Sequence, residues 1–196
     1  LGIFSQNGEI STFTPNDLDH VFESEHFRFH YTNEGTDAVS DPNYIFQMAD
    51  VFEEVNSFYI DTLNFSAPAS DPASDDILYN VFVENLPTFY FGITYTKNTS
   101  VSSPACVSYI KMRNNYDGSQ FSEHTELENV QVTAVHEFFH AIQFSYNCYE
   151  RFWFMEATAV WSEDELYNNV NDHYRYISSW FSNINKSLDD ESSHMY

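Results

Sequence analysis

The sequence predicts an α+β domain, and two observations indicate this fold class. The 196 residues are 42% hydrophobic, enough to bury one sizeable core, so we expect a single domain over residues 1–196. Stretches that alternate between apolar and polar side chains are confined to residues 1–123, together with one long helical pattern, whereas residues 124–196 show helical periodicity only. Strands with one helix, followed by helices alone, are typical of an α+β fold in two layers or lobes.

The first part of the chain predicts four strands and one helix. The stretch "HFRFHYTN" at 26–33 alternates and is rich in aromatic residues, which favours a strand. Residues 41–63 carry apolar side chains every three or four positions, and Asp41-Pro42 supplies a start signal for a helix. Three further strands are expected at 77–85, 89–96 and 106–113.

An acidic loop, "SAPASDPASDD", separates the helix from the next strand at residues 66–76. Its Asp71, Asp75 and Asp76 carry oxygen ligands of the kind calcium uses, but they lack the spacing of a known calcium loop. We therefore expect a solvated turn.

The second part of the chain predicts helices at about 124–146, 152–168 and 171–186. The tail at 187–196 carries no apolar pattern and is expected to be frayed.

The charge of the chain excludes one class of partner. Thirty acidic residues against seven basic ones give a net charge of −23, whereas nucleic-acid binding needs clustered Lys and Arg. The same charge disfavours docking on anionic lipid. No apolar run reaches 18 residues, so we expect no membrane span.

The helix expected at 124–146 carries the sequence "TAVHEFFHAIQF" at 133–144, in which titratable groups interrupt an apolar run. His136 and His140 lie about 40° apart around a helix axis, with Glu137 beside them. Histidines at i and i+4 can both point a nitrogen at one zinc ion, about 2.0–2.1 Å away. Glu137 then lies beside the ion without binding it, where it can act as general base toward a metal-bound water.

A third protein ligand is expected because zinc in catalytic sites usually has three, plus water. Glu156 lies among Phe, Trp and Ala residues of the next helix, where a carboxylate without a partner is costly. We therefore predict Glu156 as the third ligand, with His173 and Glu163 as alternatives. Glu163 begins an acidic run, Glu163-Asp164-Glu165, which is typical of a solvated face.

The two segments "HEFFHAIQF" and "WFMEATAVW" resemble zincin metallopeptidases of the gluzincin type. They more closely resemble secreted bacterial putative metalloproteases with an HExxH-A-x-Q-F helix and a W-x-x-E-A/G-T-A-x-W segment. The resemblance extends loosely over 27–167 and is sharp over 130–167. It implies a small twisted sheet, mostly antiparallel or mixed, packed on the HExxH helix, with a cleft along an edge strand. It also implies a secreted protein in which His136, His140 and Glu156 bind zinc and Glu137 is the catalytic base.

The sequence departs from thermolysin-like members of that group at two points. The interval from His140 to Glu156 is shorter, and Val160 stands where those members carry an aspartate that orients a histidine ligand. A metal-bound histidine normally needs such an outer partner. Glu163 or a backbone carbonyl is the expected replacement.

These residues predict a secreted zinc metallopeptidase acting on a peptide or protein substrate. An extended substrate would pair with an exposed sheet edge, for which we expect the strand at 106–113. The alternatives are a non-catalytic surface or adhesion module stabilised by zinc, and a metal-dependent hydrolase of other bonds. The sequence indicates no oxyanion donor, since each of Tyr146, Tyr149, Tyr167, His173 and Tyr174 is as well explained by packing.

The two cysteines, Cys106 and Cys148, lie beside the expected edge strand and after the site helix. If strand and helix flank one cleft, a disulfide would brace them, and an extracellular setting would favour it. The alternative is two separate buried thiols.

Overall fold

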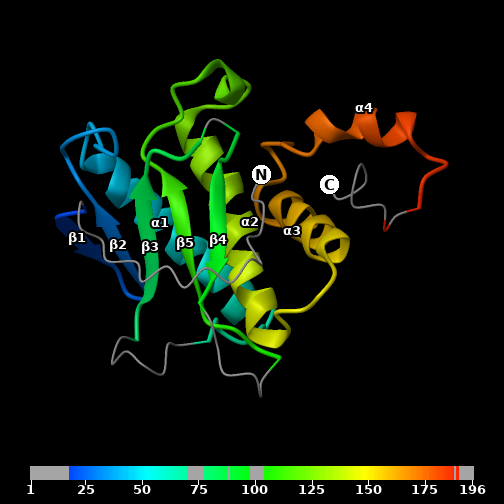
Figure 1. Ribbon diagram of the computed structural model, residues 1–196, viewed down its shortest axis with the longest axis horizontal. Helices are drawn as coiled ribbons and strands as arrows, with labels where there is room; N and C mark the ends of the chain where they lie inside the picture. Colours follow the sequence, from blue (N-terminus) through cyan, green and yellow to red (C-terminus); the bar gives the residue numbers. More distant parts are fainter. Residues whose placement is uncertain (1–17, 70–76, 88, 98–103, 188, 190–196) are drawn as a thin grey trace.

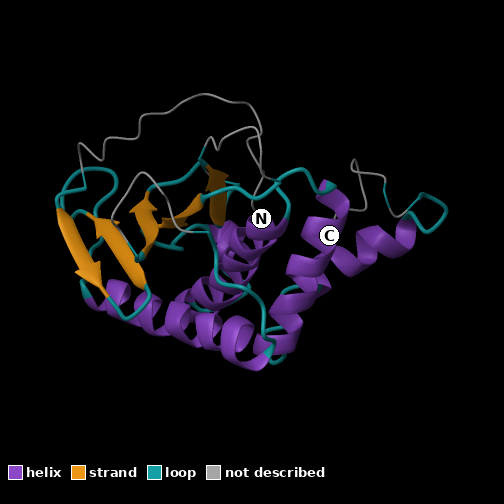
Figure 2. Cartoon of the chain, turned by 90° about the horizontal axis from the view of Figure 1, so that it is seen from below, coloured by secondary structure: helices purple, strands orange, loops and turns teal. Residues whose placement is uncertain are grey.

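The computed structural model describes residues 18–69, 77–87, 89–97, 104–187 and 189. A five-stranded mixed sheet packs against helices, and a helical part follows at the C-terminal side (Figure 1). Figure 2 shows the strands and the long helices as two layers. The predicted α+β fold class is confirmed.

The sheet has the strand order β1-β2-β3-β5-β4. Its parallel centre is formed by β2, β3 and β5, and the outer strands β1 and β4 pair antiparallel to their neighbours. The bounds of the strands are β1 His20–Glu23, β2 Phe27–Tyr31, β3 Tyr79–Glu84, β4 Gly92–Thr96 and β5 Ser108–Arg113. Four of them lie within the predicted ranges, whereas β1, with only four residues, was not predicted.

The prediction that the strand at 106–113 lies at the edge of the sheet is wrong. The strand β5, within the predicted range 106–113, lies inside the sheet between β3 and β4. After β3 the chain moves one strand position further out to form β4 and then returns, so that β5 fills the position left between them. Of the described strands, β4 is the one at this edge.

Helix α1 (Asn43–Ser57) and the π-helical turn η1 (Phe58–Thr62) together match the helix predicted over 41–63. Figure 1 shows α1 and α2 (Glu126–Tyr146) behind the sheet. The core between the sheet and these two helices is aromatic. The ring of Phe27 on β2 lies 5.1 Å from that of Phe52 on α1 and 5.1 Å from that of Phe138 on α2, both in edge-to-face contact. Offset and edge-to-face contacts of this kind stabilise a core beyond the area they bury.

The start of α2 is set by a capping box. The Thr125 side chain accepts a hydrogen bond from the Glu128 backbone N–H, and the Glu128 carboxylate accepts one from the Thr125 N–H. These bonds satisfy amide groups that the first turn leaves without a helical partner. A short 3-10 turn, η2 (Ser119–Phe121), precedes this cap.

The remaining helices are α3 (Phe152–Tyr167) and α4 (Tyr174–Ser182). Helix α3 packs on α2, whereas α4 has no buried residue among those described. The helix predicted at 171–186 is therefore shorter, in part because Asn171 adopts a left-handed conformation (φ 58°) ahead of it. None of the helices in the described ranges is long and apolar enough to cross a membrane.

Cys106 and Cys148 form a disulfide, with their Cα atoms 5.7 Å apart. Two backbone hydrogen bonds run alongside it, from Cys106 N–H to the Phe144 carbonyl and from Cys148 N–H to the Pro104 carbonyl. Of the two alternatives that the sequence left open, the structure therefore has the bridge, which ties the segment before β5 to the end of α2.

Some sequence-based expectations fall outside the described residues. These are the candidate calcium ligands Asp71, Asp75 and Asp76 and the end of the tail at 190–196.

Candidate metal centre

Two helices bring three potential ligands to one point. His136 and His140 project from α2 and Glu156 from α3, and one ligand atom of each lies within 4.8 Å of the others. The side chains are 0%, 1% and 2% exposed. The predicted residues are thus gathered in one buried cluster of the type that holds a metal ion.

Two separations within the cluster are close to those between two ligands of a single ion. The Nε2 atom of His136 lies 3.3 Å from Oε2 of Glu156, and Nε2 of His140 lies 3.7 Å from Oε1. Two ligands about 2.0–2.1 Å from a tetrahedral zinc ion are about 3.3 Å apart. These two separations are therefore compatible with a metal ion shared by the three side chains.

Unsatisfied polar atoms in the cluster are also consistent with a metal site. His136 Nε2 and Glu156 Oε2 are buried and make no hydrogen bond in the described structure, although they lie near each other. Buried polar atoms without a hydrogen bond are rare and costly in native proteins. A metal ion between them would satisfy both.

Glu163 supports His136 from the outer side. Its Oε1 lies 2.6 Å from His136 Nδ1, and its side chain is 3% exposed. Of the two replacements expected for the missing aspartate, Glu163 is thus the group that contacts His136, and it lies three residues beyond Val160 on α3. The acidic run Glu163-Asp164-Glu165 is therefore only in part a solvated face, because Glu163 is buried whereas Glu165 is exposed.

Glu137 is held against the edge strand β4. The hydroxyl of Thr94 lies 2.7 Å from Glu137 Oε2 and 2.8 Å from the Glu137 backbone oxygen. Both acceptors belong to Glu137, so the Thr94 hydroxyl proton is donated to this residue in either case. Gly92 permits this approach, because a Cβ atom there would lie 2.6 Å from Thr133 Cγ2 and 2.9 Å from Glu137 Cγ. Thr94 was not predicted, since only the strand order brings it to α2.

Gln143 is a second residue that the sequence-based analysis missed. Its Oε1 lies 2.7 Å from His140 Nδ1, and its amide nitrogen donates to Met155 O and Thr158 Oγ1 on α3. A signal for it existed: Gln143 stands three residues after His140 in "HEFFHAIQF", a spacing that places both on one helix face.

The charges of the metal-free cluster are uneven. Burial lowers the pKa of His136, but the Glu156 and Glu163 carboxylates outweigh burial and raise it to about 10. Burial and the charge of His136 hold the pKa of His140 well below its usual value. Burial raises the pKa of Glu163 to about 7 and raises that of Glu137. The carboxylates thus favour a positive charge at His136, and a bound cation would displace that proton.

The other sequence candidates do not belong to the group of three ligands and have other surroundings. His173 Nδ1 is 3.6 Å from Asp164 Oδ1. Tyr167 donates its hydroxyl to Glu54, and Tyr146 donates to Ser66. The two remaining tyrosines, Tyr149 and Tyr174, are 74% and 62% exposed.

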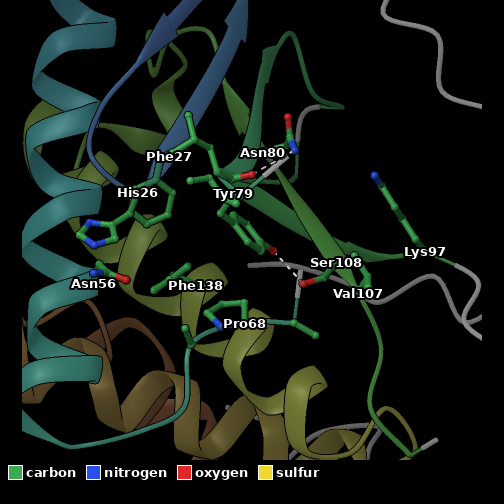
Figure 3. A pocket seen from close by; sticks show the side chains of 14 residues that line it. His26, Phe27, Asn56, Pro68, Tyr79, Asn80, Lys97, Val107, Ser108 and Phe138 are labelled. Carbon is green, nitrogen blue, oxygen red and sulfur yellow. Dashed lines mark hydrogen bonds between the residues drawn. The ribbon is translucent and has the colours of Figure 1, made fainter. Parts of the chain in front are cut away.

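A surface pocket lies at another place, among α1, β3 and β5 (Figure 3). The Tyr79 hydroxyl and Ser108 Oγ, 2.8 Å apart, form part of its polar lining. Phe138 borders it from α2, but its lining includes none of the residues of the metal cluster. The pocket and the cluster are therefore separate features.

Comparisons with known proteins found no match: no family model, curated protein sequence or solved structure matches the chain.

Proposed function

We propose that this chain is a secreted zinc metallopeptidase with one domain, in which His136, His140 and Glu156 hold the ion and Glu137 is the general base. The observation that carries the proposal is the convergence of three buried ligand atoms, two of them without a hydrogen bond, beside a buried glutamate. The donor set of two imidazoles and one carboxylate is the one that catalytic zinc sites of this chemistry use.

A zinc ion held there would supply Lewis acidity toward a peptide carbonyl and a water molecule. The carboxylate of Glu137 would accept a proton from the attacking water and return it to the leaving amine. Thr94 orients that carboxylate through the hydroxyl contact at 2.7 Å. Glu163 would orient the His136 imidazole through its Nδ1 atom.

The strand β4 supports a peptide as substrate. It lies at the edge of the described sheet, and its residue Thr94 contacts Glu137. An extended chain that pairs with β4 would therefore lie beside the base, as strand addition to a sheet edge requires. The Cys106–Cys148 disulfide supports an oxidising, extracellular setting.

One observation favours the alternative, a non-catalytic module stabilised by zinc. The three ligand side chains are at most 2% exposed, which is the burial of a structural site. A structural zinc site, however, usually has four protein ligands, and the cluster in the described residues has three. The presence of three protein ligands instead of four, with a glutamate beside them, therefore favours catalysis.

Metal analysis and peptide cleavage test the proposal together. Freshly purified protein should contain about one zinc per chain, and His136→Ala, His140→Ala or Glu156→Ala should each weaken zinc binding by roughly 10²–10³-fold, since a ligand contributes a few kcal/mol. His20→Ala on β1 is the matched control and should bind normally. A wild-type protein that takes up no zinc on titration contradicts the metal centre.

Cleavage of a fluorogenic peptide library, with and without chelator, separates the two functions. Both predict that zinc stabilises the fold, by about 2.7 kcal/mol at a hundred times the dissociation constant. Only the peptidase predicts cleavage that the chelator stops and zinc restores. Zinc-bound protein that cleaves no peptide supports the structural module.

A further inference from the structure

The side-chain amide of Gln143 connects two of the proposed metal ligands. It lies on α2 one turn beyond His140, and it reaches α3 on both sides of Glu156, at Met155 and Thr158. All three of its contacts are between 2.7 and 3.0 Å. The amide thus bridges the helix that carries the histidines and the helix that carries the glutamate.

The hydrogen-bond network determines which way the amide faces. The Met155 carbonyl can only accept, so the Gln143 atom beside it must be the nitrogen. The Thr158 hydroxyl donates its proton to the Phe154 carbonyl at 2.7 Å and therefore accepts from the same nitrogen. Both amide protons are then used on α3, and the amide oxygen faces His140.

This orientation determines the tautomer of His140. An amide oxygen accepts and cannot donate, so the proton of the neutral imidazole resides on Nδ1. The other nitrogen, Nε2, then carries the lone pair and faces Glu156 at 3.7 Å. A histidine ligand needs this state, with one nitrogen protonated and held and the other turned toward the metal.

We propose that Gln143 is a positioning residue of the metal centre, which sets the His140 tautomer and holds the turn of α3 that carries Glu156 at the matching distance. The two imidazoles are thus supported differently, His136 by the carboxylate of Glu163 and His140 by an amide. The amide has the donors that join the helices, which a carboxylate lacks. This inference rests on the proposed metal site.

The test compares zinc affinity in wild type, Gln143→Met and Gln131→Met. Methionine keeps the length of the side chain without its hydrogen bonds. Gln131 is half-buried on the same helix and makes no side-chain hydrogen bond in the described structure, so it controls for the substitution itself. We expect Gln143→Met to lower zinc affinity about 10- to 100-fold, the usual effect of losing an outer partner, and Gln131→Met to leave it unchanged.

Two further readouts separate positioning from general stability. The unfolding midpoints of the metal-free variants show whether Gln143→Met loses more stability than the control, and the absorption spectrum of bound cobalt reports the geometry of the ligands. Thr158→Val removes one acceptor on α3 without changing α2, and it should lower zinc affinity in the same direction.

The outcomes distinguish this inference from the metal site itself. A wild type that binds no zinc overturns both. Wild-type zinc affinity in Gln143→Met, or an equal loss in Gln131→Met, overturns the positioning role and leaves the metal site standing. Unchanged affinity in Thr158→Val contradicts the contact to α3 and overturns the inference as stated.

Discussion

Glu137 and Phe138 are neighbours on α2 and equally buried, each 1% exposed, yet their side chains make different contacts, because consecutive residues point about 100° apart around a helix. Phe138 packs its ring against Phe27 and Tyr79 at 5.1 and 5.6 Å, whereas Glu137 meets the Thr94 hydroxyl. Burial of an apolar ring lowers the free energy of folding, and burial of a carboxylate raises it. Burial alone therefore does not separate packing from chemistry on this helix, but the cost of each burial does.

The largest effect is expected for Glu137→Gln. The amide has the size of the carboxylate but does not accept a proton at neutral pH, so peptide cleavage should fall by about 10²–10⁴-fold while zinc stays bound. Turnover of a peptide substrate and zinc content, measured on the same preparation, check this. Activity at the wild-type level would place the base elsewhere.

Phe138→Ala should produce the opposite pattern. Removing a fully packed ring from a core costs about 3–5 kcal/mol of unfolding free energy. The folded variant should still bind zinc with nearly wild-type affinity, because the Phe138 ring packs in the aromatic core. Denaturant titration measures the stability, and a zinc titration below the unfolding midpoint measures the affinity. If affinity falls in proportion to stability, the two sets of contacts are not independent.

The disulfide should affect stability without belonging to either set of contacts. The cysteines are 42 residues apart in sequence, and closing a loop of that length contributes roughly 3–4 kcal/mol if the native geometry is unstrained. Replacing both by alanine should lower the unfolding free energy by that amount. Intact mass with and without reductant confirms the bridge in the wild type. Two alkylated cysteines in an unreduced sample would exclude it.

The smallest effect is expected for Glu163→Gln. The amide oxygen keeps an acceptor for His136 Nδ1 but removes the charge 2.6 Å from it. Zinc affinity should fall about 10- to 100-fold. Glu165→Gln, in the same acidic run but exposed, is the control and should leave affinity unchanged. Equal effects of both variants would indicate a long-range charge effect instead of support for His136.

The sequence predicted most helices and strands but not the arrangement of the strands. The helix at 126–146 could be predicted from local patterns, because its capping box and its apolar spacing each involve residues only a few positions apart. The position of β4 at the edge depends on pairing between segments far apart, and alternation in residues 106–113 is the same for an inner strand as for an edge strand. Strand order therefore could not be predicted from either segment alone.

The identity of the candidate ligands followed from the sequence by itself. The spacing of His136, Glu137 and His140 on a helix is a property of helix geometry, and a lone glutamate in an apolar helix needs a partner wherever that helix packs. The tertiary structure alone decided which groups surround them. Thr94 reaches Glu137 because β4 crosses α2, and Glu163 reaches His136 because α3 packs along it. Those contacts join residues 43 and 27 positions apart, and only the packing of whole elements, with no local pattern, brings such groups within hydrogen-bonding distance.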